Sequence, residues 1–202
     1  MDSSGLYLDV TDFAHSTPAW VQSAFELWTE YGLFAFGALF VAVWWRSRGQ
    51  GDSRAVALAV LAPLVTALAY VASELVKSAV DEERPCRAVA GAAASLIPCP
   101  ATGDWSFPSN HSVIAGAAAV ALAMALPRLA LLTVPLALLM AFSRVFVGVH
   151  YPHDVVLGLV LGASLAALAV LALTGPAARV VAAVRASGVR SAVLITGPGP
   201  TR

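Results

Sequence analysis

Charged residues are scarce in this chain of 202 residues, because aspartate, glutamate, lysine and arginine together make up only 12% of it. Soluble globular domains contain about 25% charged residues. Hydrophobic residues reach 59%, and the mean hydropathy is +0.79. The shortage of charge therefore excludes an ordinary soluble domain and predicts an integral membrane protein.

The chain lacks features that other classes of protein require. The formal net charge is zero and no basic cluster is interleaved with aromatic residues, so the sequence predicts no nucleic-acid partner. The N-terminus lacks the pattern of a secretory signal, so the first apolar helix is expected to remain. Because no internal repeat or low-complexity linker occurs, we expect residues 1–202 to form one membrane-embedded domain.

Long apolar runs predict an all-α bundle of about five transmembrane helices, with room for an interfacial helix near the N-terminus. Residues 1–16 are polar and acidic. We expect Thr17 to cap a helix that begins at Pro18 and reaches about Trp45, with a more polar first half. The other four spans are expected at residues 55–76, 110–126, 129–142 and 155–174.

The distribution of arginine predicts which side of the membrane each loop faces. Arginines gather between the first two spans, in a tight turn and in the C-terminal tail: Arg46, Arg48, Arg54, Arg128, Arg179, Arg185, Arg190 and Arg202. Short loops that are rich in lysine and arginine stay in the cytoplasm. With five spans, the N-terminus is then outside and the C-terminus inside.

Three polar clusters border the apolar runs on the predicted outer side. Their sequences are KSAVDEERP at residues 77–85, FPSNHS at residues 107–112, and SRVFVGVHYPHD at residues 143–154. Polar and charged groups at the edge of a bilayer are costly unless they serve a site or pair with one another. We therefore interpret the three clusters as parts of one anion-binding pocket.

The third cluster places a carboxylate close to an imidazole. Pro152 disfavours helix at Tyr151, so the last span is expected to begin at Pro152, with Asp154 in its first turn and His150 just before it. A carboxylate that holds one imidazole nitrogen leaves the other free as a nucleophile or base. The alternative is a capping aspartate beside an interfacial histidine.

The other two clusters offer further anion-binding groups. Ser109 is expected to cap a helix whose first free N–H groups belong to Asn110 and His111, and His111 can donate a proton to a leaving oxygen. Lys77 and Arg84 can meet at one anion if the chain turns back between them. Alternatively, Ser109 and His111 are structural, Lys77 snorkels, and Arg84 pairs with a neighbouring glutamate.

The three motifs together resemble the signature of the type 2 phosphatidate phosphatase superfamily of membrane lipid phosphatases. The matching residues are KxxxxxxRP at Lys77, Arg84 and Pro85, PSxH at Pro108, Ser109 and His111, and SRxxxxxHxxxD at Ser143, Arg144, His150 and Asp154. The resemblance covers residues 77–154 and is strongest to bacterial undecaprenyl diphosphatases. Asn110 is a departure, since the family usually has glycine there, and many members have six spans.

The resemblance implies a role for each matching residue. His150 attacks phosphorus to form a phosphohistidine, Asp154 orients His150, and His111 protonates the leaving group. Lys77, Arg84, Ser109 and Arg144 hold the phosphoryl oxygens, with Asn110 beside them. No metal or other cofactor is expected, because the acidic residues 81–83 are consecutive and cannot all face one ion.

The expected function is therefore hydrolysis of a lipid phosphate or diphosphate at the outer face of a bacterial cell membrane. The substrate favoured by the resemblance is undecaprenyl diphosphate, which would yield the monophosphate. Phosphatidylglycerophosphate, phosphatidate and a phosphorylated polyprenyl sugar are alternatives. A transporter of phosphorylated lipids is a different class, but it would not need an oriented histidine and would usually show paired repeats. The oligomeric state is left open.

Cys86 and Cys99 are the only cysteines of the chain, and both lie in the loop that we place outside. Disulfides persist in oxidising compartments such as this one. We predict that the two cysteines are joined, which would stabilise the loop by roughly 3 kcal/mol in the chain-entropy model. The alternative is a pair of free thiols.

Overall fold

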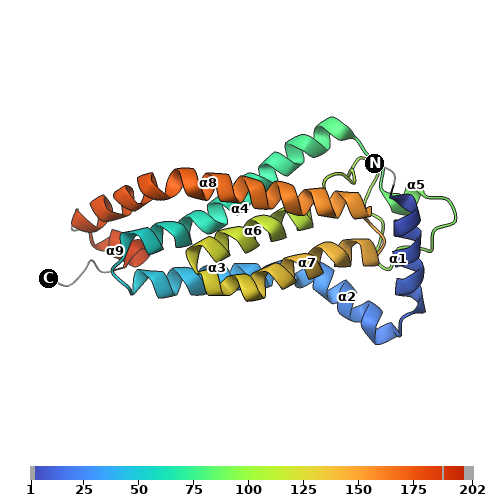
Figure 1. The fold of residues 1–202 in the computed structure, drawn as a ribbon, viewed down its shortest axis with the longest axis horizontal. Coiled ribbons are helices and arrows are strands. Elements are labelled where there is room, and N and C mark those ends of the chain that lie inside the picture. The colour runs from blue at the N-terminus through green and yellow to red at the C-terminus, as the bar shows by residue number, and fades with distance from the viewer. Residues whose placement is uncertain (1–2, 188, 198–202) are drawn as a thin grey trace.

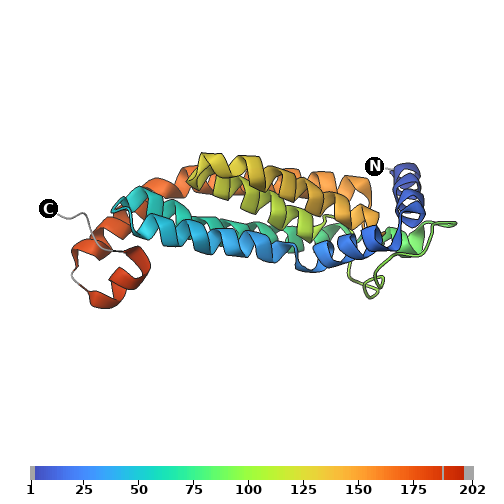
Figure 2. The same ribbon diagram turned by 90° about the horizontal axis from the view of Figure 1, so that it is seen from below.

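The computed structural model describes residues 3–187 and 189–197, and every regular element in these residues is a helix. An elongated bundle is formed by α3 (Leu33–Arg48), α4 (Ser53–Val80), α6 (Asn110–Ala125), α7 (Ala130–Phe146) and α8 (Pro152–Ala186) (Figures 1 and 2). The remaining elements are α1 (Ser4–Ser16), α2 (Ala19–Tyr31), α5 (Pro85–Ala88), the 3-10 helix η1 (Pro127–Leu129) and α9 (Arg190–Thr196). The predicted all-α class is confirmed.

Helix α6 is the centre of the bundle and contacts α3, α4, α7 and α8. Its alanines, such as Ala115, Ala117 and Ala118, are fully buried. Small residues also bring α6 and α8 into backbone contact, because a Cβ on Gly116 would lie only 2.6 Å from the carbonyl oxygen of Leu159. Close approach of this kind stabilises helix pairs in membranes by van der Waals packing.

Three described helical stretches are long and apolar enough to cross a membrane, namely Ser53–Ala88, Pro127–Phe146 and Pro152–Ala186. Helices α2 and α3 together qualify as a fourth, although they are bent by 49° relative to each other. Helix α6 is apolar but has only 16 residues, whereas a span needs roughly 20. The expected five spans are reached only if both the bent pair and α6 are counted.

The start of the chain differs from the sequence prediction in two respects. Thr17 does not cap the following helix; it ends α1, and its hydroxyl donates to the carbonyl of Ala14 at 2.6 Å. The expected continuous helix from Pro18 to about Trp45 is instead broken at Gly32. A Cβ on Gly32 would lie only 2.5 Å from the backbone carbonyl oxygen of Trp28, which cannot move aside as a side chain could and so explains why glycine stands at the bend.

The polar N-terminal stretch, whose sequence predicts no helix, contains helix α1 (Ser4–Ser16), which lies across one end of the bundle (Figure 1). Tyr7 is fully buried there, and its hydroxyl donates to the carbonyl of Gly148 at 2.9 Å. Gly148 belongs to the connection between α7 and α8 that carries His150. Helix α1 therefore covers the segment on which the third polar cluster lies.

The arginines that predict the cytoplasmic side lie at the end of the bundle opposite to the three polar clusters. Arg46 and Arg48 are in the last turn of α3, and Arg185 is in the last turn of α8, which extends well beyond the predicted end at residue 174. The guanidinium of Arg48 lies over the rings of Trp44 and Trp45, at 5.0 and 4.7 Å from their centroids. Arg202 lies outside the described residues.

The contact between α6 and α8 should be the most sensitive point of the bundle. A methyl group on Gly162 of α8 would overlap the carbonyl of Val113 of α6, so Gly162→Ala should cost about 1–3 kcal/mol by forcing the helices apart. We expect the variant to melt at a clearly lower temperature than wild type in detergent micelles. Gly175→Ala on the same helix is the control, since nothing lies within 4 Å of its Cβ position. Equal melting of the two variants would contradict this packing.

Candidate active site

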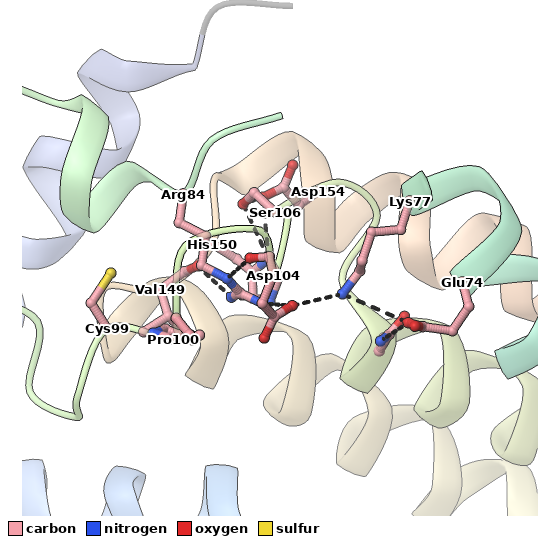
Figure 3. A network of polar contacts seen from close by, with 12 residues as sticks. Glu74, Lys77, Arg84, Cys99, Pro100, Asp104, Ser106, Val149, His150 and Asp154 are labelled. Carbon is pink, nitrogen blue, oxygen red and sulfur yellow. Dashed lines mark hydrogen bonds and ion pairs between the residues drawn. The ribbon is translucent and has the colours of Figure 1, made fainter. Parts of the chain in front are cut away.

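Residues from all three polar clusters line one cavity of about 270 Å³ at the end of the bundle covered by α1. The predicted site residues on its wall are Lys77, Arg84, Asn110, His111, Arg144 and His150. The structure thus brings together the groups that the sequence places in three separate segments. Ser109 and Asp154 are fully buried beside them. Figure 3 shows the polar contacts that join the clusters.

His150 and Asp154 form a buried pair. Asp154 lies in the first turn of α8, which begins at Pro152 as predicted, and its Oδ2 is 3.2 Å from Nδ1 of His150. The same oxygen accepts hydrogen bonds from the backbone N–H of Tyr151 at 2.8 Å and from the hydroxyl of Ser106 at 2.5 Å. The carboxylate therefore favours the tautomer of His150 with its proton on Nδ1 and leaves Nε2 as an acceptor.

The second nitrogen of His150, Nε2, faces the cationic wall of the cavity. Nη1 of Arg84 lies 3.1 Å from Nε2 and is the donor of this contact. Burial lowers the pKa of His150 well below its usual 6.5, and the positive charges of Arg144, Arg84 and Lys77 lower it further. A neutral imidazole with an available lone pair is the form that a nucleophile requires.

Two of the three cations of the cavity share one anionic partner, and the third has a neutral one. Arg84 pairs with Asp104, whose Oδ1 is 3.0 Å from its Nη2 and 3.5 Å from Nζ of Lys77. Arg144 donates from Nη1 to the hydroxyl of Thr29 at 2.8 Å. The alternative of a side-chain pair between Arg84 and a neighbouring glutamate is wrong for Glu83, which pairs with Arg87 at 2.6 Å.

The start of α6 forms another wall of the cavity. Ser109 is the N-cap residue as predicted, but its side chain makes no capping hydrogen bond, and its buried hydroxyl has no partner among the described residues. The Asn110 side chain accepts from Ser73 at 2.7 Å and donates to Glu74 at 2.5 Å. Asn110 therefore ties α6 to α4, while His111 stands on the cavity wall.

The loop between α5 and α6 is fixed by the predicted disulfide between Cys86 and Cys99, which the structure contains. Arg87 adds hydrogen bonds from its guanidinium to the carbonyls of Pro100 and Ala101. The far end of the loop is held by Ser106, whose N–H donates to the carbonyl of Glu82 at 2.7 Å. These anchors bring the loop over the cavity.

Sequence reasoning did not identify Asp104, Ser106 or Thr29 as site residues. Asp104 and Ser106 lie in an irregular loop, where no helical or strand period indicates which side chains point inward. A usable signal was that Ser106 directly precedes the FPSNHS segment and that Asp104 lies just two positions before Ser106. Thr29 lies in α2, and only the path of that helix brings its hydroxyl to Arg144.

One group of side chains in the described part of the chain has metal-ligand character. The carboxylates of Glu82 and Asp154 and Nε2 of His153 lie within 4.8 Å of one another. Nε2 of His153 is already 3.0 Å from Glu82 and 3.3 Å from Oδ1 of Asp154, and Nδ1 lies 2.7 Å from the Ser3 hydroxyl. Hydrogen bonds and ion pairing thus account for these contacts without an ion.

The model of the PAP2 superfamily matches residues 58–175, which is more than half of the chain and includes all three motifs. The chain therefore belongs to the PAP2 superfamily, and the resemblance drawn from the three motifs is confirmed. A solved structure agrees with the fold. The transmembrane PAP2 type phosphatidylglycerolphosphate phosphatase from Bacillus subtilis superposes with a TM-score of 0.59 over 81% of this chain and 82% of that one, at 23% identity.

Two relatives resemble the chain more closely in sequence. The undecaprenyl-diphosphatase BcrC from Bacillus subtilis is 35% identical over 133 residues, which cover 65% of this chain and 64% of that protein. A decaprenylphosphoryl-5-phosphoribose phosphatase from Mycobacterium tuberculosis is 37% identical over 103 residues, covering 50% of this chain and 53% of that one. The chain thus spans between about half and just under two thirds of these relatives.

The cavity should bind a tetrahedral oxyanion, and the affinity should depend on Arg144. A charge-assisted hydrogen bond contributes about 1.5–3 kcal/mol, so Arg144→Gln should weaken orthovanadate binding by roughly tenfold or more. Calorimetric titration of the full-length protein in detergent measures this affinity. Arg128→Gln removes the same charge from the opposite end of the bundle and should leave the affinity unchanged; equal loss in both variants would contradict the site.

Proposed function

We propose that this protein is a lipid phosphatase that acts through a phosphohistidine and removes the terminal phosphate of a polyprenyl diphosphate such as undecaprenyl diphosphate. The observation that carries the proposal is the environment of His150. Asp154 binds one of its nitrogens at 3.2 Å, and the other faces a cavity lined by Lys77, Arg84 and Arg144. An oriented neutral imidazole facing a cationic oxyanion pocket suits phosphoryl transfer.

In the first step, Nε2 of His150 attacks the terminal phosphorus. The bond from phosphorus to the bridging oxygen breaks, and His111 gives its proton to that oxygen, so the lipid leaves as the monophosphate. The negative charge of the bound phosphate favours the protonated form of His111. Asp154 stabilises the positive charge that develops on the His150 ring.

In the second step, water attacks the phosphohistidine. His111, now neutral, takes a proton from that water, and the P–N bond breaks to release inorganic phosphate and restore His150. In both steps the equatorial oxygens are held by Lys77, Arg84 and Arg144 together with the N-terminus of α6. These positive groups supply the charge stabilisation that metal ions provide in many other phosphatases, and we propose that turnover requires no metal.

A lipid substrate is supported by the apolar side of the cavity. Tyr70 and Ile114 also line the cavity, and the ring of Tyr70 is partly exposed on the outer surface of the bundle. Tyr70 is seven residues before Lys77 on α4, which places it roughly 10 Å deeper along the helix, and Ile114 is one turn inside α6. The phosphate would bind at the polar end, while the first part of the lipid chain would follow these apolar side chains toward the bilayer.

The similarity to BcrC favours undecaprenyl diphosphate as the substrate. The Mycobacterium tuberculosis relative supports a second candidate, a phosphorylated sugar on a polyprenyl phosphate carrier. The two substrates have different leaving groups: an anionic lipid phosphate in the first case and a hydroxyl-bearing sugar in the second. Competition between the two substrates separates the candidates.

We also propose that the site faces the outside of a bacterial cell membrane. The support is the arginine distribution, since Arg46, Arg54, Arg128 and Arg185 lie near the end of the bundle opposite to the cavity. Such arginines favour the cytoplasmic side. An outward site would act on a lipid carrier after its cargo has been used.

The purified protein should release phosphate from undecaprenyl diphosphate faster than from phosphatidylglycerophosphate, phosphatidate or a decaprenyl phosphosugar phosphate. Release should persist in excess EDTA and should be inhibited by vanadate, which resembles the transferring phosphoryl group. His150→Ala should abolish release, and His111→Ala should slow it by roughly 100-fold or more.

His15→Ala is the matched control, because His15 lies on α1 away from the cavity wall. It should keep wild-type activity. Activity of His150→Ala comparable to wild type would refute the mechanism, and loss of activity in EDTA that Mg²⁺ restores would refute metal-independent turnover. Preference for the phosphosugar lipid would select the second candidate.

Labelling in intact cells can test the orientation. Gln50 and Thr102 are exposed at opposite ends of the bundle, and unlike neighbouring Gly51 and Gly103 they do not have positive φ. The native cysteines are joined to each other, so an introduced cysteine is the reactive thiol. A membrane-impermeant maleimide should label Thr102→Cys and spare Gln50→Cys, and the reverse result would place the site on the cytoplasmic face.

A further inference from the structure

Asp104 lies on the wall of the cavity that, under the proposed function, receives the phosphate. Its Oδ1 contacts two cations at once, Nη2 of Arg84 at 3.0 Å and Nζ of Lys77 at 3.5 Å (Figure 3). These are two of the groups assigned to the phosphoryl oxygens. A carboxylate oxygen shared by an arginine and a lysine has the charge and the geometry of a phosphate oxygen in the same place.

The protein itself already occupies the donors of Arg84. A guanidinium has five N–H groups, and four of those on Arg84 have acceptors. The carbonyl and the carboxylate of Asp104 take one each, and the carbonyl of Val149 and Nε2 of His150 take the other two. A phosphate therefore cannot gain a bidentate contact with Arg84 unless one of these acceptors leaves.

Among these acceptors, the Asp104 carboxylate is the most easily displaced. Its side chain is 48% exposed, whereas the His150 side chain is 2% exposed. Asp104 ends a run of four exposed residues, 101–104, that includes Gly103 at a φ of +88°. The run is anchored at its first residue, where Arg87 donates to the carbonyl of Ala101, and just after its last, where Ser106 bonds to Glu82 and Asp154. The carboxylate can therefore swing out while the rest of the loop stays in place.

Asp104 also remains charged while it occupies this position. Partial burial alone would raise the pKa of the Asp104 carboxyl, but hydrogen bonds and the charges of Arg84 and Lys77 outweigh that effect and hold it below its usual 3.8. At neutral pH the cations thus face an ionised carboxylate whenever the site is empty.

We propose that Asp104 competes with the phosphate for Lys77 and Arg84, and that substrate binds by displacing its carboxylate. A phosphoryl group carries more negative charge and more acceptor oxygens than one carboxylate, so it wins the exchange. After hydrolysis the carboxylate returns to the two cations and helps to expel inorganic phosphate. Asp104 thereby sets the affinity for substrate and product and offsets part of the positive charge of Lys77 and Arg84 while the site is empty.

The test compares inorganic phosphate binding to wild type, Asp104→Asn and Glu83→Gln, each as the full chain in detergent. Asparagine keeps the size of the side chain and removes its charge, so the dissociation constant for phosphate should fall roughly tenfold, which corresponds to about 1.4 kcal/mol. Glu83→Gln removes a negative charge from the short connection between α4 and α5, at the same end of the bundle, but Glu83 pairs with Arg87 outside the cavity. Its phosphate affinity should stay within about twofold of wild type.

Calorimetric titration with phosphate gives the affinity, and the KM for a lipid phosphate should fall in parallel. Unchanged or weaker phosphate binding in Asp104→Asn would overturn the proposal, because it would mean that Asp104 only positions Arg84. Asp104→Ala provides a second, independent comparison if the asparagine variant melts early.

The proposed competition rests on the proposed function, but the experiments distinguish failure of the one from failure of the other. Tighter phosphate binding in Asp104→Asn without hydrolysis of any lipid phosphate would refute the phosphatase assignment and leave the competition in place. Hydrolysis of a lipid phosphate together with unchanged affinity in Asp104→Asn would refute the competition alone. Absence of phosphate binding in all three proteins would refute the competition as well.

Discussion

The carboxylate of Asp154 is the interaction on which the arrangement of the site depends. It is fully buried, and one of its oxygens accepts from His150, from the hydroxyl of Ser106 and from the N–H of Tyr151. These partners come from the connection before α8 and from the loop before α6. A buried charge is tolerated only when it is paired and hydrogen-bonded. Asp154 therefore holds together segments that are far apart in the chain and fixes the ring of His150.

A second constraint is the crowding of positive charge. Lys77, Arg84 and Arg144 line one small cavity, and like charges at such short range destabilise the folded state unless anions neutralise them. Asp104 and Glu74 supply the negative charge around Lys77. Arg144 instead has a neutral partner, Thr29, and its buried Nε has no partner among the described residues. The stability of the site and its affinity for phosphate are thus linked through the same groups.

The small side chains of the central helix α6 help to assemble the site. Helix α6 is rich in alanine and contains Gly116, so α4, α7 and α8 approach it closely, and the polar residues at their ends meet around its N-terminus. Helix α1 closes the same end through Tyr7 and Gly148. The polar residues of this N-terminal stretch gave no indication of this role, because the polarity of a surface helix does not show which part of the protein it packs against.

The sequence by itself determined the apolar all-α class, the start of α8 at Pro152, the disulfide and the six predicted residues on the cavity wall, because composition, proline geometry and motif spacing are local properties. Only the tertiary structure decided the bend at Gly32, the covering by α1, and the contacts of Asp104, Ser106 and Thr29 with the site. The physical reason is that an irregular loop has no period that shows which side chains point inward. The partners of its polar groups are fixed only when distant helices pack together.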